Sequence, residues 1–348
     1  MAGHIAGQDL IETRGVGRAL DAFVVAAAFE RAGGFCAFAL GDGSLRIAEA
    51  GTVAPWRTVA AHAGVVLALA PDAAARGFIC GGDDGAFRRI SAGGEVEDIA
   101  RFGSRWVEHV AAHPGEKGSG AIAAAVGREV HLFDATGNKL KTLEHPSTAT
   151  GIAFDRKGKR IAASHYNGAS LWFVAAKEDR PRSLEWKGSH IAIAIHPEGD
   201  AVITAMQDNA LHGWSLPDGK HMQMSGYPGK TESLSFSRRG KWLATSGAEA
   251  IVVWPFFGGG PMGKPPLELA GVDRCSCARV ACHPEHEVVA GGYSDGRVLA
   301  VDIDSGRVLP VAGPRRDAVS ALAWSPDGRY LALGTEEGFA AIVDFSPR

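Results

Sequence analysis

VSALAWSPDGRYLALGTEEGFAAIVDF, residues 319–345, is the stretch of the chain that decides the fold. Three apolar runs in it are separated by two turn sequences, Ser325–Gly328 and Glu336–Gly338. The runs are Val319–Ala323, Tyr330–Leu333 and Phe339–Val343. Alternating apolar residues bounded by Pro, Asp and Gly predict three short strands joined by tight turns. A sheet this small cannot bury its own apolar face, so we expect similar sheets beside it.

The rest of the chain supplies such copies. One turn position recurs at intervals of 42, 43, 40, 41, 41, 46 and 42 residues, occupied by Asp42, Asp84, Gly127, Asn167, Asp208, Glu249, Asp295 and Glu337. A first turn precedes each of these positions at a nearly constant offset. A fixed period of about 40 residues is the signature of a repeat architecture. The sequence therefore contains eight repeat units, numbered one to eight below.

Eight such units predict an all-β fold, an eight-bladed β-propeller of four-stranded antiparallel blades. A seven-bladed ring with one displaced unit is the alternative. No linker interrupts the units, so residues 1–348 are expected to form a single propeller domain. The last unit ends after its third strand, and we expect a strand within Asp9–Arg14 to complete it. Pairing the two ends of the chain would remove exposed sheet edges.

Several residues in these units resemble the WD40 repeat. The Ser-Pro-Asp-Gly turn of that family is complete at 325–328, and an aromatic residue closes the third strand at Trp214 and Trp254. His62 and His145 occupy the position of the family's histidine. The resemblance implies a propeller in which this histidine joins a buried hydrogen-bond network with the second-turn residue. We expect that network between His62 and Asp84, and in part between His145 and Asn167.

Composition excludes several classes of protein. The net charge of −3 argues against a non-specific grip on nucleic acid, which needs a strongly basic field. The N-terminal residues lack a secretory signal pattern, and no apolar run is long enough to span a membrane. Five cysteines in a large chain favour a reducing compartment, so a cytoplasmic location is expected. The Ala- and Gly-rich composition favours a bacterial source with a GC-rich genome.

Two stretches carry candidate partner-binding residues. Arg105 and Trp106 lie before the first strand of unit three, and aromatic and guanidinium groups often anchor interfaces. Ordinary packing within the blade is the alternative for Trp106. Phe256 and Phe257 begin the longest irregular insertion, residues 255–266, where exposed rings would mark a contact site. The alternative is that both rings fold back over the adjacent blade.

Acidic second-turn residues would gather at one end of the ring. Most of them are explained as turn caps, because Asp bonds its own backbone in tight turns. Glu249 and Glu337 cap poorly and are therefore the better candidates for partner binding. Cys275 and Cys277 are close in sequence, but a structural zinc site needs four ligands, so small buried residues are the simpler interpretation and no metal or cofactor is predicted.

No catalytic motif occurs in the sequence. The resemblance to WD40 proteins implies a non-catalytic, cytoplasmic scaffold that presents a rigid propeller face to protein partners, without a nucleic-acid or membrane role, as a monomeric propeller within a complex. The alternative is an enzyme, or a propeller that binds a small ligand or metal in its central channel.

Overall fold

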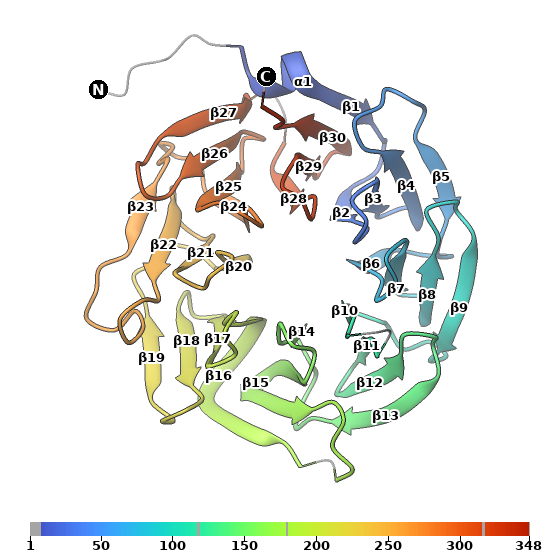
Figure 1. Cartoon of the computed structure of the whole chain (residues 1–348), viewed down its shortest axis with the longest axis vertical. Coiled ribbons are helices and arrows are strands. Elements are labelled where there is room, and N and C mark those ends of the chain that lie inside the picture. Colours follow the sequence, from blue (N-terminus) through green and yellow to red (C-terminus); the bar gives the residue numbers. More distant parts are fainter. Residues whose placement is uncertain (1–7, 117–118, 179, 315–316, 348) are drawn as a thin grey trace.

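The computed structural model describes residues 8–116, 119–178, 180–314 and 317–347. In these residues the chain forms one short helix and a series of strands arranged as a closed ring around a central axis (Figure 1). Neighbouring strands within every sheet are antiparallel. The prediction of an all-β propeller is confirmed.

The strands follow the repeat units in order. Units one to three contribute β2 (Val24–Phe29), β3 (Phe35–Leu40), β4 (Ser44–Glu49), β5 (Arg57–Ala60), β6 (Val66–Pro71), β7 (Phe78–Gly82), β8 (Ala86–Ile90), β9 (Val96–Arg101), β10 (His109–His113), β11 (Ala121–Val126), β12 (Glu129–Asp134) and β13 (Lys139–Glu144). Units four and five contribute β14 (Gly151–Phe154), β15 (Arg160–Phe173), β16 (Arg182–Ile195), β17 (Ala201–Met206), β18 (Leu211–Ser215) and β19 (His221–Met224). Units six to eight contribute β20 (Leu234–Phe236), β21 (Trp242–Thr245), β22 (Ile251–Pro255), β23 (Leu267–Leu269), β24 (Cys277–Cys282), β25 (Val288–Tyr293), β26 (Val298–Asp302), β27 (Val308–Ala312), β28 (Val319–Trp324), β29 (Tyr330–Thr335) and β30 (Phe339–Asp344).

The number of separate sheets differs from the prediction. The described residues form seven hydrogen-bonded sheets, six of four strands and one of six strands. The prediction of eight separate four-stranded blades is therefore wrong, and the count of seven was its alternative. The reason lies in β16, whose first half pairs with β15 of unit four and whose second half pairs with β17 of unit five. Eight repeat units thus occupy seven sheets, and no unit is displaced from the ring.

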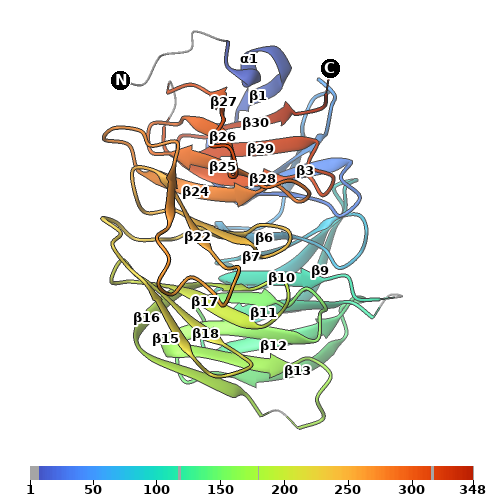
Figure 2. The same ribbon diagram turned by 60° about the vertical axis from the view of Figure 1, so that its left-hand side comes forward.

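A strand from the N-terminal region closes the ring, as expected, but it lies further along the chain. Residues Gly15–Ala19 form β1, which pairs with β30 from Gly15 opposite Val343 to Ala19 opposite Phe339. The predicted segment instead contains the helix α1 (Leu10–Arg14), which packs against β27 and β30. Figure 2 shows α1 and β1 together beside these strands.

The core lies between neighbouring sheets, where apolar residues from both sides are buried. The expected network of unit two is confirmed, because Nδ1 of His62 lies 2.8 Å from Oδ1 of Asp84. The expectation for unit four is wrong. There His145 accepts a 3.0 Å hydrogen bond from Nε1 of Trp172, whereas Oδ1 of Asn167 accepts one from the amide of Gly188.

Three histidines join neighbouring units by the same contact. Each lies at the end of the first strand of its unit, and its Nε2 lies 3.0 Å from a carbonyl oxygen in the first turn of the next unit. The pairs are His113 with Arg156, His196 with Gly240, and His283 with Gly328. These bonds add polar links between neighbouring units beside the apolar packing.

The four strands of a unit are called a to d in chain order, and their antiparallel arrangement gives the ring two different faces. The turns between strands b and c and the connections to the next unit lie on one face, called the top face here. The turns between strands a and b and between strands c and d lie on the bottom face. Among the residues that the structure describes, no helix is long and apolar enough to cross a membrane.

Candidate functional site

The structure divides the predicted partner-binding residues between the two faces. Arg105 and Trp106 lie in the connection from β9 to β10, and Glu249 and Glu337 lie in turns between strands b and c. These four residues therefore share the top face. Phe256 and Phe257 follow β22 and lie on the bottom face, so they cannot belong to the same contact surface.

Trp106 is the most exposed tryptophan side chain of the described chain, with 55% of its surface accessible. The next residue, Val107, is fully buried and its amide donates a 3.0 Å hydrogen bond to the carbonyl of Gly82. Adjacent residues of an extended segment point to opposite sides, so the anchoring of Val107 inward presents Trp106 outward. Trp106 is therefore held at the surface by a fixed backbone.

Arg105 is held beside Trp106 by an ion pair. Its Nη1 lies 2.6 Å from Oε2 of Glu129, the first residue of β12. The guanidinium carbon also lies 6.0 Å from the centre of the Phe102 ring, within the range of a cation–π interaction. The hydrogen bond from Arg105 lowers the pKa of Glu129, so this pair is charged at neutral pH. The top face thus carries a positioned cation next to an exposed indole.

Sequence reasoning missed two further aromatic residues on this face. Phe23, just before β2, is 42% exposed, and Tyr166, in the turn between the two halves of β15, is 59% exposed. The amide of Tyr166 donates a hydrogen bond of 2.9 Å to Oγ of Ser147. Both residues could have been found from their positions, since Phe23 precedes a first strand as Trp106 does, and Tyr166 precedes an Asn-Gly turn. Phe23, Trp106 and Tyr166 are called the top-face aromatics below.

The acidic turn residues fall into two groups. Asp42, Asp84 and Asp295 each accept a hydrogen bond from a backbone amide of their own turn, at 2.9, 3.1 and 3.1 Å. Glu249 and Glu337 are exposed instead. The hydrogen bond that protonated Glu337 shares with the neighbouring carboxylate of Asp317, together with the negative charge of Asp317, raises the pKa of Glu337. The first group caps turns, and the second leaves acidic groups on the top face.

The two phenylalanines of the long loop differ from each other. Phe256 packs between His196 and Phe236, with ring centres 5.9 and 5.0 Å away. Phe257 is 47% exposed, although its ring meets the edge of Trp242 at 5.2 Å. Phe256 is therefore a packing residue between units five and six, while Phe257 remains at the surface of the bottom face.

The cysteines do not converge. The pKa of Cys277 is raised to about 12 by burial, and the Sγ of Cys282 donates to the carbonyl of Ser235. In the described ranges, no three His, Cys, Asp or Glu side chains gather in a way that could hold a metal ion.

Comparison with known proteins agrees with this architecture. Residues 280–347 match the family model described as the anaphase-promoting complex subunit 4 WD40 domain. Autophagy-related protein 16 of Arabidopsis thaliana is 25% identical over 63% of this chain and 44% of its own length. Telomerase protein component 1 of Mus musculus is 26% identical over 61% of this chain and 8% of its own length. This chain therefore spans less than half of either relative.

A third relative is matched over more of its length. The serine-threonine kinase receptor-associated protein of Dictyostelium discoideum is 23% identical over 63% of this chain and 74% of its own length. Among solved structures, the computationally designed protein Ika8 superimposes with a TM-score of 0.76 over 94% of this chain and 98% of its own, at 17% identity. That likeness supports the fold alone.

The ring of repeats defines the chain as a β-propeller, and its residues 280–347 are similar to a WD40 domain. Its three named natural relatives come from a plant, a mouse and a slime mould. They give no support to the bacterial source that the composition predicts.

Proposed function

We propose that this propeller is a non-catalytic, cytoplasmic scaffold that binds a protein partner through its top face. The observation that carries the proposal is the exposed indole of Trp106, held by the buried Val107 and placed beside the cation of Arg105. Exposed aromatic side chains next to arginine are enriched at the centres of protein interfaces. The partner surface is expected to include an apolar anchor for Trp106.

The same face suggests how a partner would be oriented. The exposed carboxylates of Glu249 and Glu337 lie in units six and eight, whereas Phe23, Trp106 and Tyr166 belong to the half of the ring formed by units one to four. A partner with an apolar patch flanked by basic residues would match both parts. Such charge complementarity steers association and fixes orientation more than it adds affinity. The propeller itself is proposed to be monomeric and to have no nucleic-acid partner.

A pair of matched variants tests the proposal. Trp106→Ala removes the exposed indole, and Phe173→Ala removes a 59% exposed ring from the opposite end of a unit-four strand. Extract from the native host is passed over the immobilised wild-type protein and both variants, and captured proteins are quantified by mass spectrometry. Loss of an interface anchor costs more than 1 kcal/mol, so Trp106→Ala should reduce capture of a specific partner about fivefold or more.

Phe173→Ala should leave that partner's capture unchanged. Equal capture by all three proteins, or a loss that is the same in both variants, would contradict a top-face interface centred on Trp106. Because Trp106 and Phe173 are both surface residues, the two variants should fold like the wild type. Circular dichroism spectra and unfolding midpoints that match among the three proteins verify this, so that a change in capture reports on binding.

A further inference from the structure

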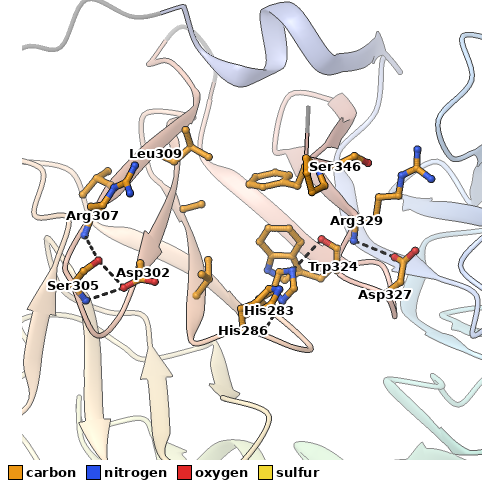
Figure 3. Close-up of a pocket in the computed structure, with 16 residues that line it drawn as sticks. His283, His286, Asp302, Ser305, Arg307, Leu309, Trp324, Asp327, Arg329 and Ser346 are labelled. Carbon is orange, nitrogen blue, oxygen red and sulfur yellow. Dashed lines mark hydrogen bonds between the residues drawn. The ribbon is translucent and has the colours of Figure 1, made fainter.

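A groove on the bottom face lies between the sheet of β24–β27 and the sheet of β28–β30. It has a volume of about 840 Å³. Its apolar lining comes from Val288, Leu309, Trp324 and Phe345. Figure 3 shows Arg307 on one side of this hollow and Arg329 on the other, with Trp324 between them. The volume falls within the range of cavities that hold small ligands or a few side chains of a peptide.

The wall of the groove formed by Trp324 is rigid. Its Nε1 donates a 3.0 Å hydrogen bond to the carbonyl of Ala281 in β24, across the seam between the two sheets. The His283 and Phe345 rings meet it in edge-on contacts, with ring centres 4.8 and 4.7 Å away. The apolar surface therefore exists before anything binds to it.

An equivalent seam between units five and six shows how this kind of surface is covered within the same protein. His196, Phe236 and Phe256 correspond there to His283, Trp324 and Phe345 (positions aligned by strand order). The amide of Phe256 donates to the carbonyl of Lys241, and the amide of Phe345 donates to that of Arg329, both at 2.8 Å. The two seams thus share a wall and a backbone arrangement.

The two seams differ in what lies over the outer strand. Met222 faces Gly213 across β19 and β18, and Leu309 faces Ala300 across β27 and β26, which are equivalent positions. Met222 is only 6% exposed, whereas Leu309 is 45% exposed. A Cβ built on Gly260 would lie 3.3 Å from Sδ of Met222, and the next residue, Pro261, is buried. The Gly- and Pro-rich loop after Phe256 therefore covers Met222, and no described residue covers Leu309 to a similar extent.

The cations beside the two seams also differ. Lys220, just before β19, pairs with Asp218 of its own turn at 2.9 Å. Arg307, just before β27, has no carboxylate of the described chain within ion-pair distance of its guanidinium. The nearby Asp302 is engaged by hydrogen bonds from Oγ and the amide of Ser305, at 2.6 and 2.8 Å. These bonds and the nearby charge of Arg307 lower the pKa of Asp302, so Asp302 is ionised but lies beyond ion-pair distance of the Arg307 guanidinium.

We propose that this groove binds a short extended segment of a partner protein that carries a proline and a neighbouring acidic residue. The proline would lie against Leu309 and Trp324, as the loop that contains Gly260 and the buried Pro261 covers Met222 at the equivalent seam, and the acidic side chain would pair with Arg307. Aromatic-lined grooves bind proline-containing segments well because the extended conformation costs little entropy. This site lies on the opposite face from Trp106 and is independent of the function proposed above.

The test uses a displayed library of short random peptides, selected on the full-length wild-type protein after depletion on the Leu309→Glu variant. Selected sequences should contain proline next to aspartate or glutamate. A synthetic peptide of the most enriched sequence is then titrated by fluorescence anisotropy. Leu309→Glu should weaken its binding at least about tenfold, because it places a charge in the apolar centre. Arg307→Glu should weaken it about fivefold.

Three matched variants serve as controls. Lys220→Glu makes the charge change of Arg307→Glu at the equivalent position of the covered seam. Leu140→Glu changes another exposed leucine, 51% accessible, on an outer strand. Trp106→Ala removes the top-face anchor. All three should bind the peptide like the wild type, so that failure of the top-face proposal would not affect this result.

Several outcomes would overturn the proposal. They are a selection that enriches no sequence on the wild type over Leu309→Glu, enriched peptides that are basic or lack proline, and binding that survives both Leu309→Glu and Arg307→Glu. Light scattering adds a further one. If the wild type dimerises and Leu309→Glu is monomeric, the occupant of the groove is a second copy of the chain.

Discussion

At the scale of single residues, three contacts between units depend on the fit of a histidine ring over a glycine. His113 lies over Gly158, His196 over Gly240 and His283 over Gly328, each glycine having a positive φ. A Cβ built on Gly328 would lie only 2.1 Å from two atoms of the His283 ring. The ring also donates through Nε2 to the carbonyl of Gly328, while Nδ1 accepts from the amides of Glu285 and His286. Glycine is therefore needed for two reasons, its backbone conformation and its lack of a side chain.

These two reasons can be separated with matched glycines. Gly328 has φ +69°, and Gly306 has φ +71° but nothing within 4 Å of a built Cβ. Gly306→Ala should cost only the left-handed backbone term, about 1 kcal/mol of unfolding free energy. Gly328→Ala should cost about 2–4 kcal/mol, because overpacking against the ring is added. Urea denaturation measures both.

A double variant isolates the contribution of the ring. In the His283→Ala background, the cost of Gly328→Ala should fall toward that of Gly306→Ala, since the obstructing ring is gone. If the cost of Gly328→Ala is the same with and without His283, the contact between the ring and the glycine does not determine which residue fits.

At the scale of elements, α1 and β1 act together to complete the ring. Ile11 of α1 is 8% exposed and packs with Val311, Leu331 and Val343, which come from β27, β29 and β30. The helix packs against β27 and β30 along the seam that holds the groove, and β1 then adds the fourth strand to the last sheet. The side chain of Ile11 therefore links the closing strand to two neighbouring sheets.

Truncation of that side chain should weaken the closure. Ile11→Ala is expected to lower the unfolding free energy by about 2–3 kcal/mol, because buried isoleucine contributes transfer energy and leaves a cavity when removed. Glu12→Ala, one residue along and exposed, should change it by less than about 0.5 kcal/mol. Equal unfolding midpoints for the two variants in guanidinium would show that α1 does not support the closed ring.

Much of this arrangement could be predicted from the sequence, and the failures have physical causes. The repeated turns located nearly every strand, because turn chemistry is local. The closing strand was misplaced because β1 reads Gly-Val-Gly, a poor strand pattern, and Gly17 is needed there to make room for the Phe339 ring. The sequence does not predict the sheet shared by units four and five, because no turn residue or other local sequence pattern indicates that β16 continues from one unit into the next. For the site, the sequence leaves two interpretations of Trp106, partner binding or packing within the blade, and its exposure agrees with the first. The groove could not be predicted, because it depends on a loop that covers the seam between units five and six while no such loop covers the seam between units seven and eight.

At the scale of the whole molecule, buried histidines couple stability to pH. Burial lowers the pKa of His109, His131 and His145 to about 4, on three different strands or connections of units three and four. In the unfolded chain the pKa of these histidines is about 6.5. As the pH falls below that value, the unfolded state takes up protons that the folded state excludes. Stability is therefore fully present above about pH 6.5 and is lost as the pH falls toward about 4.

This linkage predicts a specific profile. The unfolding free energy from urea titrations should stay constant between about pH 8 and 7, and should fall by at least about 2 kcal/mol by about pH 5. His145→Gln, which keeps a polar side chain near Trp172 but cannot titrate, should make the fall shallower. A profile that is flat between about pH 7 and 5 would mean that these histidines are protonated in the folded protein as well.

The pairing of β1 with β30 has a consequence for how the protein is made. Val16 lies opposite Ile342, so the two strands of one hairpin-like pair are separated by almost the whole chain. At ribosomal rates of about 5–20 residues per second, β1 leaves the exit tunnel roughly 15–65 s before its partner is synthesised. During that interval the nascent ring has two unpaired strand edges. The nascent protein is therefore expected to be vulnerable to misassembly, and dependent on chaperones, until β30 has been synthesised and has paired with β1.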